Sequence, residues 1–215
     1  ADDQCFQTIA SLGYDEVQTP NLDRLAKSGT TFTHAYNMGS WSGAVCVASR
    51  TMLNSGRFVW NANRIWNQSE QEREQGRWWG EHMKSAGYRT YMTGKWHVTR
   101  FTGPDGPKDN WPLQRGFERF YGTITGAGSF YDPATLCRGN TYITPVNDPE
   151  YEPEVYYYTD AISDNAVTFL GDHAKQTPDR PFFLYVSYTA AHWPMHALPS
   201  DIAKYKGKYD DGFAP

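Results

Sequence analysis

The sequence lacks the features of a membrane protein and of a disulfide-stabilised scaffold. Its longest uninterrupted apolar run covers only residues 182–186, whereas a membrane-spanning helix needs about 20 apolar residues. Only 3 cysteines occur in 215 residues, Cys5, Cys46 and Cys137, an odd number at no metal-ligand spacing. We therefore expect no transmembrane span, no disulfide framework and no zinc site.

The sequence also lacks a large excess of charge of either sign. The chain has 20 Lys and Arg against 24 Asp and Glu, a formal net charge of -4, and no basic run. This balance excludes nucleic acid and an anionic membrane as the main partner. The same charge balance still allows a local basic pocket that binds a small anion.

Aromatic residues, by contrast, are abundant, with 8 Trp, 15 Tyr and 11 Phe. Together with the length, they predict an aromatic-rich core in one domain over residues 1–215, without an internal boundary. The sequence begins without Met and stops in a turn-like stretch, so we interpret it as part of a longer chain. No signal peptide is visible in it.

Hydrophobic periodicity and helix-stop signals predict alternating helices and strands. Thr19 and Pro20 are typical of a helix start, and Gly29, Gly56 and Gly87 of helix ends. Residues 101–153 are rich in Gly, Pro, Asn and Asp, so we expect long ordered loops there. The alternation favours an α/β sheet with helices on its faces. Helices are expected over 19–26, 46–55, 77–86 and 159–175, and strands over 30–36, 88–93 and 181–188.

The segment 46–50, with the sequence CVASR, follows a glycine-containing turn and opens a predicted helix. A helix N-terminus offers free N–H groups to an anion, and Arg50 lies one turn beyond Cys46. This arrangement places a nucleophile beside an anion site. For a lone cysteine, a buried structural thiol and an ordinary Arg50 ion pair would be the favoured interpretation.

The segment 46–50 resembles the signature of the type I sulfatases, and further blocks extend the resemblance. Ala48 stands where many members have proline, and Val98-Thr99 replaces the usual Leu-Gly, so the loop beyond His97 is expected to differ. The resemblance implies an alkaline-phosphatase-like sandwich of a mixed, mostly parallel sheet with helices on both faces, incomplete at both ends. The blocks, in family order, are ADD at 1–3, TPNLDRL at 19–25, GYRT at 87–90, GKWH at 94–97 and TAAHWP at 189–194.

The resemblance implies that Cys46 becomes formylglycine and that Asp2, Asp3 and position 46 contact one calcium ion. The family takes a further aspartate and asparagine from later in the chain, so half of a calcium site is expected. Two adjacent carboxylates repel each other, and a shared cation relieves that repulsion. On the two residues alone, a solvated turn would be preferred.

Lys95 and His97 alternate with Trp96. If 94–98 is extended, both polar side chains face one way and the indole faces the other. His192 follows a predicted strand, where open α/β sheets place ligand sites. The general alternatives are a snorkelling lysine and structural histidines. By resemblance, Lys95 and His192 contact the sulfate and the leaving group, and His97 assists the formylglycine.

The implied reaction is hydrolysis of sulfate esters of carbohydrates or of aryl or alkyl alcohols. A hydrated formylglycine attacks sulfur, Arg50 stabilises the diol oxygen, and elimination releases sulfate. The implied partners are a sulfate ester and a formylglycine-generating or maturase enzyme, in the periplasm or outside the cell. The segment alone is expected to be inactive. Weaker candidates, each more readily a loop, outer-pocket or structural residue, are Ser129, His196 and Arg57.

Two other functions stay open from the sequence. One is a phosphonate or phosphate-ester hydrolase of the same superfamily, because similar parts serve phosphate esters. The other is a non-catalytic remnant that binds anions or glycans, with its aromatic-rich loops stacking on sugar or aryl groups. The sequence does not name the alcohol half of the ester.

Overall fold

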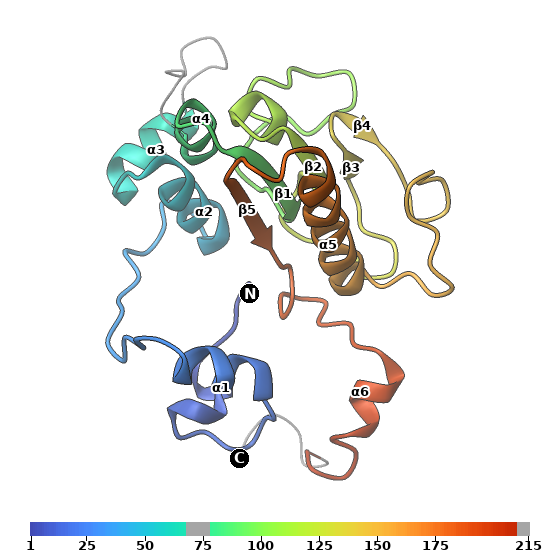
Figure 1. Ribbon diagram of the computed structural model, residues 1–215. Coiled ribbons are helices and arrows are strands. Elements are labelled where there is room, and N and C mark those ends of the chain that lie inside the picture. Colours follow the sequence, from blue (N-terminus) through green and yellow to red (C-terminus); the bar gives the residue numbers. More distant parts are fainter. Residues whose placement is uncertain (68–77, 210–215) are drawn as a thin grey trace.

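A computed structural model describes residues 1–67 and 78–209. It contains a five-stranded mixed sheet with strand order β4-β3-β2-β1-β5 (Figure 1). The strands are β1 (Arg89–Gly94), β2 (Arg119–Thr123), β3 (Leu136–Arg138), β4 (Thr141–Tyr142) and β5 (Phe182–Ser187). The helices are α1 (Pro20–Lys27), α2 (Val45–Ser55), α3 (Val59–Asn67), α4 (Trp79–Ser85), α5 (Tyr158–Gln176) and α6 (Pro199–Ala203), with short 3-10 turns at Phe6–Thr8, Ala10–Leu12 and Pro112–Arg115.

The three longest strands are parallel. β1 lies between β2 and β5, and Thr93 is in register with Tyr121 of β2 and Val186 of β5. β3 runs antiparallel to β2, and β4 antiparallel to β3. Because β1 and β5 are parallel neighbours, the residues that follow them meet at one edge of the sheet, where open α/β sheets bind ligands.

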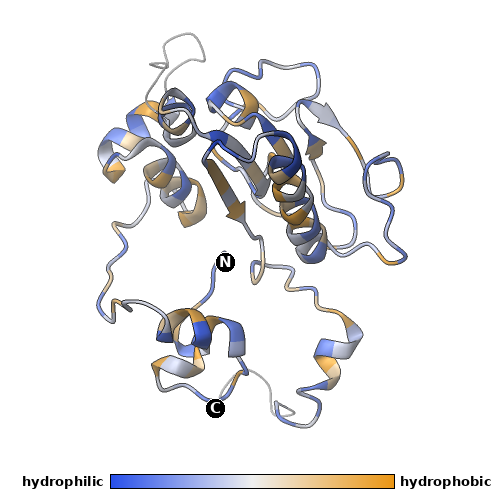
Figure 2. Ribbon diagram, viewed as in Figure 1, coloured by the Kyte–Doolittle hydropathy of each residue, from blue (hydrophilic) through white to orange (hydrophobic). Residues whose placement is uncertain are grey.

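Side chains alternate between two apolar cores, one on each face of the sheet. Met92 and Phe120 belong to the core that includes Trp96 and Phe117, on the face covered by α4. Tyr91 and Tyr121 belong to the other core, with Leu184 of β5 packed against it, and α5 covers this core through contacts with β1, β2 and β5 (Figure 1). Figure 2 colours β5 as largely hydrophobic, which suits a strand packed on both faces. Helices on both faces confirm the expected layering.

Most of the predicted helices are confirmed. α2 ends at Gly56, which adopts the left-handed conformation at φ 63 and caps the helix. α5 spans one residue more at each end than predicted, and its buried side includes Ile162, Phe169 and His173. α4 begins at Trp79, whereas the predicted start at residue 77 lies outside the described residues. Neither α3 nor α6 was predicted.

The predicted strand over 30–36 is wrong. Residues 30–44 contain no helix or strand. Phe32 and Tyr36 are 81% and 85% exposed. A strand needs a neighbouring ladder as well as suitable residues, and no described strand pairs with this segment.

The prediction of loops throughout 101–153 is also wrong, because β2, β3 and β4 lie there. Gly122 shows why a loop-like composition misled the prediction. A Cβ atom on Gly122 would collide with the backbone of Gly94 in the neighbouring strand. The glycine therefore permits close strand approach, a role that composition alone does not distinguish from a turn.

No helix that the structure describes, in residues 1–67 and 78–209, combines the length and apolar character required to cross a membrane.

Candidate functional site

The N-terminus of the chain lies at the carboxyl end of β5 (Figure 1). The backbone N–H of Asp2 donates to the carbonyl of Ala190 at 2.8 Å. From the neighbouring strand, the N–H of Lys95 donates to the carbonyl of Ser187 at 2.8 Å. These two bonds bring the first residues of the chain to the same sheet edge as the residues that follow β1.

A buried charge cluster occupies this edge. The carboxylate of Asp2 accepts a hydrogen bond from the fully buried ammonium of Lys95 and lies 3.4 Å from a guanidinium nitrogen of Arg50. Arg50 also donates to the Lys95 carbonyl at 2.9 Å and to the hydroxyl of Ser187. One carboxylate thus faces two cations, which leaves a net positive charge suited to an anion.

Cys46 lies in the first turn of α2 and is partly buried. It lines a cavity of about 240 Å³ together with Asp2, Ser49 and Arg50. The free N–H groups of a helix N-terminus attract anions, so the thiol and an anion-binding environment share one hollow. The remaining lining residues are Ala1, Leu53 and Tyr185 to Tyr188.

His97 follows β1 in a left-handed conformation at φ 52. The segment 94–98 is therefore not extended throughout, which was the condition set for the alternation of its side chains, since Gly94 also has a positive φ of 100. The expected separation of side chains is nevertheless present. Trp96 is buried in the core, where its indole N–H donates to the Asn110 carbonyl at 2.7 Å, while Lys95 contacts Asp2 on the site side.

The electrostatic environment keeps His97 neutral. Burial, together with the positive charges of Lys95 and Arg50, lowers the pKa of His97 to about 4. At neutral pH the imidazole therefore has a free lone pair and can accept a proton. The charge of His192 contributes to the same pKa shift, which places the two histidines within electrostatic range.

His192 lies beyond the end of β5, and its Nε2 is 3.5 Å from the carboxylate of Asp3. Its Nδ1 contacts the Trp193 carbonyl at 2.6 Å. Asp3 is exposed and has a left-handed φ of 57. The adjacent carboxylates thus have different environments, with Asp2 buried against cations and Asp3 at the surface beside a histidine.

The three weaker candidates have other contacts. The Ser129 hydroxyl accepts hydrogen bonds from the N–H groups of Tyr131 and Asp132, as in a Ser turn. The Nδ1 of His196 accepts from the N–H of Phe130 at 3.3 Å. Arg57 lines a separate, wider hollow of about 590 Å³ with Trp79 and His82.

The donor set fits calcium in kind but not in number. Asp2 and Asp3 offer the oxygen ligands that calcium prefers, yet fewer than the six to eight oxygens that it takes. One oxygen of Asp2 already faces both Lys95 and Arg50. Within residues 1–67 and 78–209, no group of three or more His, Cys, Asp or Glu side chains is placed to hold a metal ion.

Two site residues were not singled out from the sequence. The hydroxyl of Ser187 donates to the Lys95 carbonyl at 2.8 Å and accepts from Arg50. The Tyr185 hydroxyl lies 3.4 Å from Arg50. Both belong to β5, and their position beside the end of β1 was the available signal, since the carboxyl ends of parallel strands share an edge.

The chain matches known proteins over its whole length. The family model described as Sulfatase matches residues 1–214. An arylsulfatase of Klebsiella aerogenes is 28% identical over 240 residues, covering 100% of this chain and 46% of the relative. An N-acetylglucosamine-6-O-sulfatase of Bacteroides thetaiotaomicron is 29% identical over 193 residues, covering 89% of this chain and 29% of the relative. The chain thus spans less than half of the length of these curated relatives.

Solved structures share the fold. The structure of Ps i-CgsB in complex with k-i-k-neocarrahexaose has a TM-score of 0.73 at 26% identity, covering 95% of this chain and 47% of that chain. A complex described as containing its substrate, D-glucosamine-2-N,6-O-disulfate, has a TM-score of 0.70 at 25% identity, covering 97% and 36%. The sheet with helices on both faces is the alkaline-phosphatase-like fold of these sulfatases. With a family model matched over nearly every residue, the chain belongs to the sulfatase family.

Proposed function

We propose that the protein containing this chain hydrolyses sulfate esters and that residues 1–215 form the N-terminal portion of its catalytic domain. The observation that carries the proposal is the placement of Cys46 in one hollow with Arg50 and Asp2, beside buried Lys95. Membership of the sulfatase family supports the reaction type. The net positive charge of the cluster supports an anionic substrate.

Each charged side chain has a distinct role in this proposal. Lys95 and Arg50 bind and orient the sulfate oxygens, because both are already held in place by Asp2. Fixed cations stabilise charge that develops in the transition state without reorganising. His97, neutral through its lowered pKa, accepts a proton at the nucleophile. His192, beside Asp3, donates a proton to the departing ester oxygen, which leaves as the alcohol.

The family implies two groups that would complete the site. Formylglycine formed from Cys46 would supply the nucleophile as a hydrated aldehyde. Calcium supplies Lewis acidity toward the sulfate oxygens. Asp2, Asp3 and position 46 would hold the ion, with the remaining ligands from other parts of the protein. A formylglycine-generating or maturase enzyme is the implied partner for the conversion of Cys46.

A sulfated sugar is the substrate class that the relatives favour. One curated relative is named for N-acetylglucosamine-6-O-sulfate, and two similar structures contain carbohydrate ligands. Exposed aromatic residues next to the site, such as Trp193 at 70% exposed, suit stacking on a sugar ring.

The test is sulfate release from a panel of sulfated mono- and oligosaccharides by the full-length protein, produced with a formylglycine-generating system. We expect sulfate release by the wild type and by Cys5→Ala, and none by Cys46→Ala. Of the three cysteines, Cys46 is the one that lines the charged cavity. Peptide mass spectrometry should find formylglycine at position 46 and thiols at Cys5 and Cys137. Equal release by Cys46→Ala, or an unmodified Cys46 in an active enzyme, would contradict the proposal.

A further inference from the structure

The ring of His97 lies directly against the backbone of Gly126. A Cβ atom added to Gly126 would come within 3.0 Å of three ring atoms, Cε1, Nδ1 and Nε2, which real Cβ atoms essentially never do. The positive-φ glycines do not include Gly126, so its backbone conformation accepts other residues. Position 126 therefore needs a glycine because the imidazole of His97 fills the space of a side chain, and not because of its backbone conformation.

The segment that carries Gly126 is anchored before the contact. The N–H of Ile124 donates to the Thr135 carbonyl at 3.2 Å, and the N–H of Thr125 donates to the Thr135 hydroxyl at 3.0 Å. The N–H of His97 in turn donates to the Ile124 carbonyl at 3.1 Å. The backbone of His97 and the segment that carries Gly126 are thus held by the same short set of hydrogen bonds.

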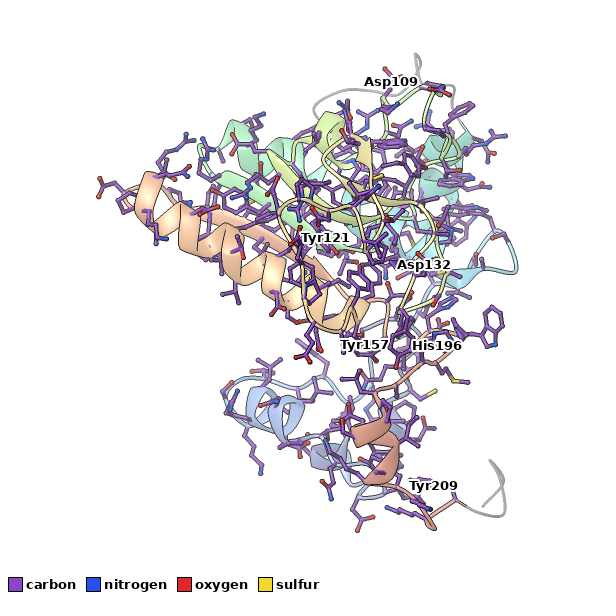
Figure 3. The ribbon with its side chains drawn as sticks, turned by 90° about the vertical axis from the view of Figure 1, so that its right-hand side faces the viewer. Asp109, Tyr121, Asp132, Tyr157, His196 and Tyr209 are labelled. Carbon is purple, nitrogen blue, oxygen red and sulfur yellow. The ribbon has the colours of Figure 1, made fainter. Side chains whose placement is uncertain are left out.

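The segment is also anchored after the contact. The N–H of Phe130 donates to His196, and the carbonyl of His196 accepts from the Tyr157 hydroxyl at 2.9 Å. Figure 3 shows His196 and Tyr157 close to each other, below Asp132. The ring centroid of Tyr131 lies 5.6 Å from that of Tyr157. With both ends fixed, the segment has little room to retreat from the imidazole.

We propose that Gly126 is a positioning residue for the reaction, and that its bare backbone fixes the orientation of the His97 ring in the site. This inference rests on the proposed function, in which His97 accepts a proton. A side chain at position 126 would push the ring away from its present place, because the two anchors hold the segment. Misplacing a reacting group by about 1 Å can cost a hundredfold in rate.

The experiment compares Gly126→Ala with Gly128→Ala in the full-length enzyme. Gly128 lies in the same segment, also without a positive φ, and a Cβ there meets Ala134 and not a histidine. We expect kcat on a sulfate ester to fall about tenfold to a hundredfold in Gly126→Ala, with KM changed less than about twofold. Gly128→Ala should stay within about threefold of the wild type. An equal loss in both variants would overturn the proposal.

A double-mutant cycle isolates the contact. In a His97→Gln background the reacting imidazole is gone, so adding Gly126→Ala should lower kcat much less than it does in the wild type. If the fold-losses of kcat in the two single variants multiply in the double variant, Gly126 acts independently of His97, and the proposal would be overturned. If Gly126→Ala does not fold, combining it with His97→Ala should restore folding because the ring is removed. Failure to do so would equally overturn it.

A readout independent of activity separates this inference from the proposed function. With ¹³Cε1-labelled histidine, Gly126→Ala should shift the NMR signal that disappears in His97→Gln, whereas Gly128→Ala should leave it in place. An unshifted signal would overturn the inference. An enzyme that releases no sulfate, yet shows this selective shift, would disprove the proposed function alone and leave the positioning of His97 supported.

Discussion

The fully buried ammonium of Lys95 donates to the carboxylate of Asp2, a residue 93 positions earlier in the chain. This pair joins the first residues of the chain to the end of the central strand β1. A guanidinium nitrogen of Arg50 lies 3.4 Å from the same carboxylate, so Asp2 positions both cations of the site.

Removing Lys95 should therefore affect both stability and activity. Lys95→Met should lower the free energy of unfolding by about 1.5–3 kcal/mol, because it removes a charge-assisted hydrogen bond to Asp2, which keeps Arg50 as its second cation, and should lower turnover of a sulfate ester. Urea unfolding and steady-state kinetics measure the two effects. Lys84→Met, on an exposed position of α4, is the control and should change unfolding by less than about 0.5 kcal/mol. Similar losses in both variants would contradict the prediction.

His97 should remain neutral down to unusually low pH. Burial, and after it the charges of Lys95 and Arg50, lower its pKa from 6.5 to about 4. An NMR titration of labelled histidine should show the His97 signal, identified by its loss in His97→Gln, moving only near pH 4. A midpoint near 6.5 would show that the ring is not buried beside Lys95 as described.

The same pKa shift sets a direction for stability. The unfolded chain protonates His97 near pH 6.5 and the folded chain only near pH 4. The contribution of this group to stability is therefore complete above about pH 6.5 and declines as the pH falls toward 4. Unfolding titrations should show a weaker pH dependence over this interval in His97→Gln than in the wild type; an unchanged dependence would contradict the assignment.

Calcium binding should require more than this chain supplies. A polypeptide of residues 1–215 should show weak or no calcium binding by calorimetry, because Asp2 and Asp3 offer too few oxygens and Asp2 is paired with Lys95. The full-length protein should bind calcium, and Asp3→Asn in it should weaken that binding. A tight site in residues 1–215 would show that the described donors suffice.

The packing of α5 on the sheet predicts a sharp difference between two positions on the same helix. Phe169 is 1% exposed, and its ring packs against Tyr91 and beneath the guanidinium of Arg119. Phe169→Ala should lower the free energy of unfolding by about 3–5 kcal/mol. Val167 is 68% exposed, and Val167→Ala should cost less than about 0.5 kcal/mol. Equal losses of unfolding free energy in the two variants would show that α5 does not pack on the sheet through Phe169.

The strongly periodic parts of the fold could be predicted from the sequence. The apolar positions of α5 recur at helical spacing, and an apolar run follows it as β5, so local pattern and tertiary packing agree. The segment 30–36 has β-type residues but lacks a partner strand, and pairing is a non-local property. β2 was missed because Gly122 looks like a turn residue but serves the close approach of Gly94.

The site shows the same division. Cys46, Arg50, Lys95 and His192 come from motifs, so their identities could be predicted from the family resemblance. Their contacts depend on which strands are neighbours. The hydrogen bond from the Ser187 hydroxyl to the Lys95 carbonyl follows from the pairing of β1 with β5, which the sequence does not state.

Steady-state kinetics on a matched aryl sulfate and aryl phosphate test the central claim most directly. The full-length protein with modified Cys46 should show a higher kcat/KM for the sulfate ester, because its chain belongs to the sulfatase family. Lys95→Ala and His192→Ala should both lower turnover of the sulfate. A higher kcat/KM for the phosphate ester, or unchanged turnover in both variants, would contradict the account.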